Sequence, residues 1–504
     1  MKVAIIDLGF NTVKLACYYL QKDNSYKAYR QDGVSVRLGE GMSRKGYLEN
    51  IPIQRTVTAL KLFRDVLTFE GIDQVIPVAT SAVRDAKNKL EFLEQVKNET
   101  GFKFRVLSGA EEAIYSFIGA LESTCYPSCL FFDLGGGSLE MIYAEKFEIK
   151  RLRSLPLGAL RLSLEYAKKD GTFSRKSYEK MKRHVLKMLP TREEMGIGTD
   201  TELVGVGGSL RALARFDQED KEYLLDKIHN YKIDYDSITS ISKIIGKMNS
   251  DELADIKSIG NNRSRTIVAG CCVIAGLMER FGFERVVVSA HGLREGVLSV
   301  SAKDPETLFS INIKKRAKSL ITSACKVAEL LPFAFNLVEP FVSAGMLREN
   351  ERSILNLAMH ILNRPMMIAN LHNLFHIILD EDLPYLSHRE QIVLALAVIH
   401  AQKEKTAEWL FERYSAILRV QNKCSIEKIS ALCTTARILE YAKATVQVSI
   451  LKHKASITII SGNKLPIMLL EDAFKKCEKA FDISINYQFA SSRIPLNHAK
   501  KESR

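Results

Sequence analysis

Phe132-Asp133-Leu134-Gly135-Gly136-Gly137-Ser138 follows an apolar run that begins at Ser128, and this stretch decides the fold. The apolar run predicts a buried strand, and the glycines predict a tight loop directly after it. Glycines weaken a core strand, so three in succession are expected where the backbone must come close to a ligand such as phosphate. Asp133 at the strand end is placed to bind Mg²⁺, directly or through water. A simple flexible loop is the alternative interpretation.

A similar stretch lies about 126 residues earlier in the chain. The apolar segment Val3–Asp7 leads into Gly9-Phe10-Asn11-Thr12, so both stretches have a strand, an Asp, a Leu, a Gly and then a hydroxyl-bearing residue. Such a repeat predicts two related halves that face each other. Strand and helix patterns alternate over about residues 1–300, which predicts the α/β class.

A third glycine loop, Gly205-Val206-Gly207-Gly208-Ser209, ends the apolar strand expected at Glu202–Val206. It opens an expected helix at Leu210–Phe216, and the N-terminus of a helix favours anions. One glycine loop is a weak signal. Three of them at strand ends are much more specific for phosphate binding.

Charged residues follow two further strands, and the residues alone leave their roles open. Arg84 could clamp a phosphate or simply pair with its neighbour Asp85. Glu111 and Glu112 begin a helix, where they could compensate the helix dipole or supply a general base. His291 stands in another turn after a strand, and we assign it no role.

The pattern changes near Ser301–Phe309, where Lys303-Asp304-Pro305 interrupts it. From there to about Ala444 the sequence predicts helices almost throughout, and the last segment predicts a hairpin, a helix and a strand. The predicted division is an α/β domain at 1–123, a second α/β domain at 124–302, a helical module at 306–444 and a small α+β segment at 445–504.

Composition excludes several classes of protein. The chain has 504 residues, of which 46% are hydrophobic and 26% charged, as is typical of globular proteins. No apolar run reaches the ~20 residues of a membrane span. Asp7 interrupts the apolar core that a signal peptide would need, and the nine cysteines show no paired spacing. We therefore expect a cytoplasmic protein without a membrane span, a disulfide framework or a zinc framework.

The net charge is +13, and one segment is especially basic. Between residues 168 and 187, eight Lys and Arg side chains stand against Asp170 and Glu179. Such a cluster attracts polyanions, although a solvated helix face is the alternative interpretation.

Taken in order, these motifs resemble the exopolyphosphatase/guanosine pentaphosphate phosphohydrolase (Ppx/GppA) phosphatase family over about residues 1–300. The segment Ser154-Leu155-Pro156-Leu157-Gly158-Ala159 is similar to the family's turn before a helical insertion. That family belongs to the actin-like superfamily. The resemblance implies two actin-like (ribonuclease H-like) α/β domains that face each other across a cleft. Longer members carry a C-terminal HD-like helical module, which residues 306–504 resemble in length and helicity.

The resemblance also implies roles for individual residues. Glu112 matches the catalytic base that activates water, and Asp133 matches the acid associated with Mg²⁺ or another divalent cation. Arg84 matches the phosphate-contacting Arg. The residues that match the three phosphate loops are Asp7, Gly9, Asn11 and Thr12, then Gly135, Gly136, Gly137 and Ser138, then Gly207, Gly208 and Ser209.

The implied activity is release of terminal orthophosphate from linear inorganic polyphosphate, by a homodimer with no nucleic-acid partner. The alternatives are 5′-phosphohydrolysis of guanosine pentaphosphate and a catalytically weak sensor of polyphosphate or alarmone. A sugar kinase fits less well, because Glu112 and the basic surface suit hydrolysis better.

Two departures from the family motivate the sensor. Phe10 stands where the first loop usually has Ser, and residues 306–504 contain no His-Asp dipeptide for a working HD metal site. His372 and His376, four apart on an expected helix, leave a weak metal pair open.

Overall fold

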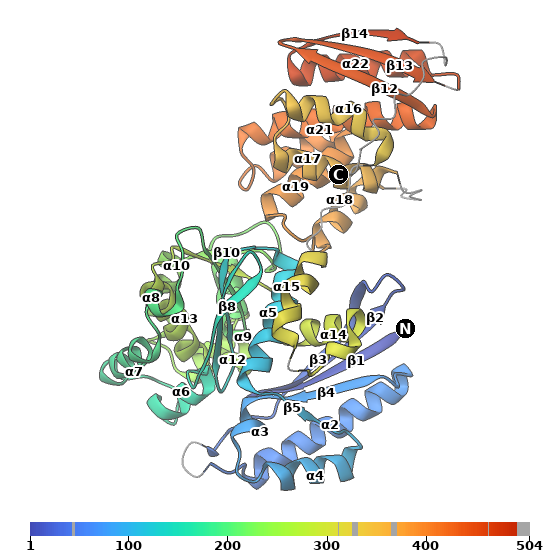
Figure 1. Ribbon diagram of the computed structural model, residues 1–504. Coiled ribbons are helices and arrows are strands. Elements are labelled where there is room, and N and C mark those ends of the chain that lie inside the picture. Colours follow the sequence, from blue (N-terminus) through green and yellow to red (C-terminus); the bar gives the residue numbers. More distant parts are fainter. Residues whose placement is uncertain (43–45, 311, 325–330, 364–369, 462, 491–504) are drawn as a thin grey trace. The chain divides into compact units, whose positions relative to one another are not determined.

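The computed structural model describes residues 1–42, 46–310, 312–324, 331–363, 370–461 and 463–490. They form two compact units, Met1–Cys325 and Lys326–Arg504. The first unit combines helices with two sheets, and the second is mostly helical with a small sheet (Figure 1). The protein therefore has the mixed α/β fold that the sequence predicts.

The first sheet of unit 1 has the strand order β3-β2-β1-β4-β5. Its strands are β1 (Lys2–Leu8), β2 (Thr12–Leu20), β3 (Tyr26–Ser35), β4 (Val75–Ala79) and β5 (Arg105–Val106). β1, β2 and β3 are antiparallel neighbours, whereas β4 lies parallel to β1 and β5 parallel to β4. Helices α2 (Asn50–Glu70) and α4 (Lys89–Thr100) contribute apolar side chains to the core on this sheet.

The second sheet has the order β10-β11-β9-β6-β7-β8. Its strands are β6 (Cys129–Leu134), β7 (Leu139–Glu145), β8 (Glu148–Leu155), β9 (Glu202–Val206), β10 (Lys232–Asp234) and β11 (Arg285–Val288). β6 is antiparallel to β7 and parallel to β9, and β11 is parallel to β9. Helix α13 (Ile267–Phe281) is almost wholly buried in the core beside this sheet.

The two sheets repeat one arrangement, which confirms the predicted internal repeat. The order β3-β2-β1-β4-β5 corresponds to β8-β7-β6-β9-β11 in both sequence and strand direction. The two glycine stretches are equivalent hairpin turns. The Gly9 N–H donates to the Thr12 carbonyl at 3.1 Å, and the Gly135 N–H donates to the Ser138 carbonyl at 3.0 Å.

Two helices join the halves of unit 1. Helices α5 (Gly109–Thr124) and α14 (Leu293–Lys303) share one apolar core with strands of both sheets (Figure 1). They approach closely because Gly119 and Gly296 have no side chains: a Cβ at Gly119 would collide with the Gly292 carbonyl oxygen, and one at Gly296 with that of Tyr115. The N-terminus of α5 reaches the point where the glycine turns meet.

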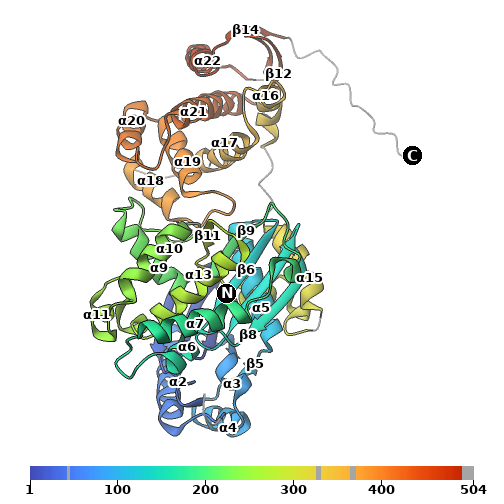
Figure 2. The same cartoon turned by 90° about the vertical axis from the view of Figure 1, so that its left-hand side faces the viewer.

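Unit 2 is built around α19 (His388–His400), which is buried along almost its whole length. Four helices contact it: α17 (Glu349–Leu362), α18 (Leu371–Asp380), α20 (Glu404–Arg413) and α21 (Val420–Tyr441). The predicted hairpin and strand form a three-stranded sheet, visible at the end of the unit in Figure 2. Its elements are β12 (Ala444–Leu451), β13 (Lys454–Ser461), α22 (Ile467–Phe481) and β14 (Ser484–Phe489).

The short helix α12 (Gly260–Arg263) precedes α13, which begins at Ile267. Seven cysteines of the described chain are free thiols. Within the described ranges, no helix combines the length and the apolar character that a membrane span requires.

Candidate active site

A cleft of about 110 Å³ lies between the two halves of unit 1, where the glycine turns meet. The predicted site residues that line it are Asp7, Gly9, Asn11, Thr12, Glu112, Asp133, Gly135, Gly136, Gly207, Gly208 and Ser209. Arg84, Gly137 and Ser138 stand just behind this lining. Arg84 contacts Glu112, a Cβ at Gly137 would collide with Phe10, and Ser138 is buried.

The third glycine loop closes the cleft from the side of β9. Gly207 has a φ of 125°, which disfavours residues with a side chain, and it is followed by α9 (Gly208–Asp220). A Cβ at Gly208 would collide with the guanidinium of Arg263. The bare backbone at Gly208 therefore leaves room for a basic side chain at the N-terminus of a helix, a position suited to an anion.

Glu111 and Glu112 are adjacent but lie in different environments. Ser108 caps α5: its hydroxyl accepts from the Glu111 N–H, and the Glu111 carboxylate accepts from the Ser108 N–H at 2.8 Å. Successive helical residues point about 100° apart. Glu112 accordingly lines the cleft and is only 7% exposed. The two interpretations left open by the sequence thus fit different residues, since Glu111 caps the helix and Glu112 faces the cleft.

The Glu112 carboxylate is surrounded by charges of both signs. Arg84 Nη1 donates to Glu112 Oε2 at 2.7 Å and to the Leu107 carbonyl at 3.2 Å. Burial raises the pKa of Glu112 to about 7, helped by Asp133 and Asp7 and opposed by Arg84. A carboxyl group with such a pKa is a base of suitable strength near neutral pH.

Asp133 lies near the end of β6. The hydroxyl of Ser116, one turn along α5 from Glu112, donates to Asp133 Oδ2 at 2.6 Å. Burial raises the pKa of Asp133, whereas Ser116 and Lys14 favour its ionised form. Asp7, the equivalent residue on β1, faces Lys14 across the β1–β2 pair, with Nζ and Oδ2 3.8 Å apart.

A fourth carboxylate, Glu140, was not predicted from the sequence. It lies on β7 directly opposite Asp133 in the antiparallel register, and its side chain is fully buried. The Ser154 hydroxyl donates to Glu140 Oε1 at 2.9 Å. Burial, Glu112 and Asp133 raise the pKa of Glu140 well above its usual range. In the sequence, Glu140 could have been recognised only as a charged residue inside an otherwise apolar stretch.

Four basic side chains line the same cleft, and the sequence analysis identified none of them: Lys14, Arg211, Arg263 and Arg294. Burial lowers the pKa of Lys14 to about 8, although Asp7 opposes this effect. Burial and the neighbouring Arg211 lower the pKa of Arg263 to about 10. Cations crowded in this way are stabilised by a ligand that carries several negative charges.

Arg294, one of these four cations, lies beside the carboxylate of Glu295. Arg294 Nη2 lies 3.8 Å from Glu295 Oε1, which also accepts a 2.6 Å hydrogen bond from the Tyr18 hydroxyl. Although burial opposes ionisation, Arg294, His291 and Tyr18 lower the pKa of Glu295 to about 2. Glu295 therefore stays charged and anchors Arg294 at the cleft wall.

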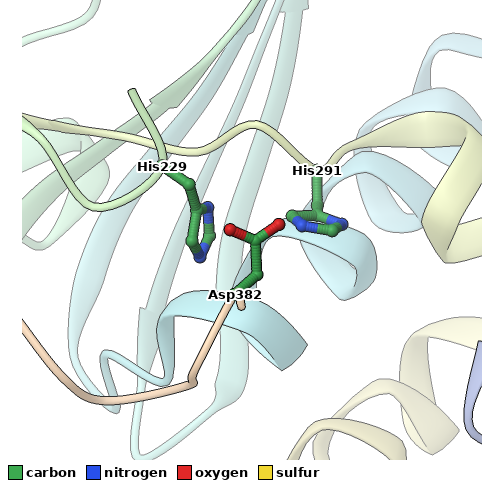
Figure 3. Close-up of side chains that lie close together, drawn as sticks. All are labelled: His229, His291 and Asp382. Carbon is green, nitrogen blue, oxygen red and sulfur yellow. The ribbon is translucent and has the colours of Figure 1, made fainter. Parts of the chain in front are cut away.

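Two histidines form the edge of the site near the end of β11. The rings of His229 and His291 lie edge to face with centroids 5.1 Å apart (Figure 3). The Ala290 N–H donates to His229 Nδ1 at 3.3 Å, and His229 Nε2 lies 3.1 Å from the Ser123 carbonyl. His291, to which the sequence gave no role, lines the cleft.

Two sheets that repeat one strand order and whose glycine turns meet at a polar cleft are typical of the actin-like fold. The Ppx/GppA phosphatase family model matches residues 21–304. The chain belongs to this family, which confirms the resemblance drawn from its motifs.

Relatives match over about the same region. An exopolyphosphatase from Cytophaga hutchinsonii is 25% identical, with a TM-score of 0.56 over 60% of this chain and 98% of that one. A bifunctional 3-dehydroquinate synthase/phosphatase from Fusobacterium nucleatum is 28% identical over 57% of this chain and 45% of its own length. A guanosine-5′-triphosphate,3′-diphosphate pyrophosphatase from Vibrio vulnificus is 27% identical over 58% of each. The chain thus spans about half the length of these two relatives.

Proposed function

We propose that the chain is an exopolyphosphatase that releases terminal orthophosphate from linear polyphosphate. The observation that carries this proposal is the buried Glu112, whose pKa of about 7 suits a base and which lies in the same cleft as three glycine turns and four cations. Phosphoryl transfer needs mostly positioning and charge neutralisation. The similar Cytophaga hutchinsonii protein is an exopolyphosphatase, which supports the same substrate.

In the proposed reaction Glu112 accepts a proton from a water molecule. The water oxygen forms a bond to the terminal phosphorus, the bond from that phosphorus to the bridging oxygen breaks, and orthophosphate leaves the shortened chain. The remaining backbone N–H groups of the two turns that follow Gly9 and Gly135, together with those at the N-terminus of α9, would hold the phosphate oxygens. Arg84 orients the Glu112 carboxylate throughout, since it donates to Oε2 at 2.7 Å.

The carboxylates of the cleft are of the chemical type that a divalent cation prefers. Asp7, Glu112 and Asp133 bring carboxylate oxygens into one pocket, and burial raises the pKa of Asp133 and of Glu112, so a nearby cation would relieve their repulsion. Hard cations such as Mg²⁺ prefer oxygen ligands. We propose Asp133 as the residue that holds it. When bound, Mg²⁺ would neutralise charge on the non-bridging phosphate oxygens.

Hydrolysis of guanosine pentaphosphate at its 5′ γ-phosphate is the second candidate. The Vibrio vulnificus relative, a guanosine-5′-triphosphate,3′-diphosphate pyrophosphatase, supports it. Phosphate release from long-chain polyphosphate and from guanosine pentaphosphate, measured in parallel with and without Mg²⁺, decides between the two substrates. A chain that binds either ligand but releases no phosphate would instead be the catalytically weak sensor.

For unit 2 we propose a degenerate HD-like module that binds substrate and joins two chains. The sequence predicted that this module begins at residue 306, whereas α15 (Ile313–Ala324) belongs to unit 1. No His-Asp dipeptide occurs in residues 306–504. His400 Nδ1 lies 2.8 Å from the Ser430 hydroxyl, and His372 and His376 approach to 3.2 Å between their Nε2 atoms. Sedimentation analysis tests the homodimer. Metal-dependent phosphodiesterase activity that survives Glu112→Gln would contradict the non-hydrolytic role.

A further inference from the structure

The first and second glycine turns, which come from different halves of unit 1, touch each other through Phe10. Phe10 is only 4% exposed. Its ring occupies space that two glycines leave empty, because a Cβ at Gly39 or at Gly137 would collide with it. Phe10 therefore does not extend toward solvent as a loop residue usually does, and it joins the turn of β1–β2 to the turn of β6–β7.

Arg161 covers this contact from helix α6 (Ala159–Tyr166). Its guanidinium lies over the Phe10 ring, 5.4 Å from the centroid. Its Nε donates to the Gly137 carbonyl at 2.8 Å, and its Nη2 donates to Asp85 Oδ2 at 3.0 Å. One side chain from the second half thus contacts its own glycine turn and two residues of the first half.

The contact to Asp85 continues to the proposed base. Arg84 Nε lies 3.6 Å from Asp85 Oδ1, while its Nη1 donates to Glu112 at 2.7 Å. Arg84 is therefore shared by two carboxylates. Arg161 is the second cation on Asp85, so it limits how strongly Asp85 competes with Glu112 for Arg84.

We propose that Arg161 is a positioning residue for phosphate hydrolysis: it clasps the two glycine turns around Phe10 and holds Asp85 so that Arg84 remains on Glu112. This inference rests on the proposed function. Arg161 is not among the residues that line the cleft. Arg161 acts through its hydrogen bond to the Gly137 carbonyl. It also acts through its ion pair with Asp85, which contacts Arg84, which in turn contacts Glu112.

A charge-removing variant and its compensating double variant test the path through Asp85. In Arg161→Gln, Asp85 loses one cation and draws Arg84 away from Glu112. We expect kcat to fall by about 10–100-fold, the usual cost of a misplaced catalytic group, with a smaller change in KM. In Arg161→Gln/Asp85→Asn the competing carboxylate is gone, and most of the lost kcat should return. Arg153→Gln removes an exposed Arg whose side chain donates to the carbonyl of its neighbour Leu152, and it serves as the control.

Two results would overturn the path through Asp85. One is an Arg161→Gln variant with the kcat of Arg153→Gln. The other is a double variant that recovers nothing, because a merely structural role for Arg161 would not be repaired by removing Asp85. Arg161→Lys keeps the charge and provides a second variant if Arg161→Gln does not fold.

Amide hydrogen exchange tests the clasp without any reference to activity. In the Arg161→Gln variant without substrate, the amide hydrogens of residues 135–138 should exchange at least about tenfold faster than in the wild-type chain. The reason is that the turn loses the hydrogen bond that Arg161 donates from outside its hairpin. Phe10→Leu should accelerate the same amides less. Exchange that is unchanged in Arg161→Gln would refute the clasp. If the wild-type chain releases no phosphate from either substrate, the proposed function fails while this measurement still decides the clasp.

Discussion

Arg84 Nη1 lies 2.7 Å from Glu112 Oε2, so a permanently charged guanidinium holds the carboxylate that we propose as the base. The pair has opposing effects on catalysis. The ion pair fixes the direction of the carboxylate, but it also favours the ionised form and so weakens the base. Burial outweighs the effect of Arg84, since the pKa of Glu112 still rises to about 7.

Replacing Glu112 should separate chemistry from binding. Glu112→Gln keeps the size of the side chain but removes its ability to accept a proton, so kcat should fall by about 10²–10⁴-fold while KM stays near the wild-type value. Glu111→Gln is the matched control, because glutamine also serves in a capping box and Glu111 lies outside the cleft lining. A Glu111 variant that is the less active of the two would show that the base is assigned to the wrong residue.

The pH dependence of kcat/KM should report the raised pKa of Glu112. The base must be ionised, and its pKa lies at about 7 instead of the ordinary 4.5. The rate should therefore fall about tenfold per pH unit below that value and level off above it. Steady-state assays from weakly acid to weakly basic pH test this, with Glu112→Gln expected to lose the acid limb. An acid limb near 4.5 would contradict the prediction.

Asp133→Asn should weaken the response to Mg²⁺. An amide is a poorer ligand than a carboxylate for a hard cation. The Mg²⁺ concentration for half-maximal phosphate release should rise by about 10–100-fold, as when groups around a metal are removed. Asp65→Asn, which changes an exposed carboxylate, is the control. Equal Mg²⁺ midpoints in both variants would remove Asp133 from the proposed metal site.

The basic lining should act on substrate affinity. Arg263→Gln removes a half-buried cation beside Gly208 and should raise KM for polyphosphate by about 10–100-fold, the range for losing one charge-assisted hydrogen bond. The effect on kcat should be smaller. Arg265→Gln, two residues further on at an exposed position, has the same change in charge and should stay near wild type. If both variants behave alike, Arg263 contributes only to the overall charge.

The exposed basic face of α7 (Arg175–Met188) should matter for long chains only. Met181 and Val185 bury one face, which leaves Lys176, Lys180, Arg183 and Lys187 at exposed positions. Changing these four to Gln should raise KM several-fold for long polyphosphate, flatten its salt dependence and leave short chains unaffected. Lys182 is left unchanged because it pairs with Glu279 at 2.9 Å. Equal effects on long and short chains would contradict this.

The sequence identified the parts of the site that depend on local backbone geometry. A glycine after an apolar strand is visible within a few residues, and the three loops predicted in this way meet at one cleft. Four basic residues come together only through packing between elements that are distant in the sequence: Lys14, Arg211, Arg263 and Arg294. No local sequence pattern therefore predicted that they line the cleft. The residues alone did not show whether Glu111 or Glu112 faces the cleft. The resemblance pointed to Glu112, and the observed start of α5 places Glu112 in the cleft lining.

The residue at which α5 begins affects how variants of this chain should be interpreted. The reciprocal bonds between Ser108 and Glu111 determine where α5 begins and hence the rotational phase of the whole helix. If a deletion in the connection before α5 shifted the helix by one residue, each of its side chains would turn by about 100°. The side chain of Glu112 would then leave the cleft although the amino acid itself was unchanged. The length of the segment between β5 and α5 is therefore a constraint on chemistry as strict as the choice of amino acid at position 112.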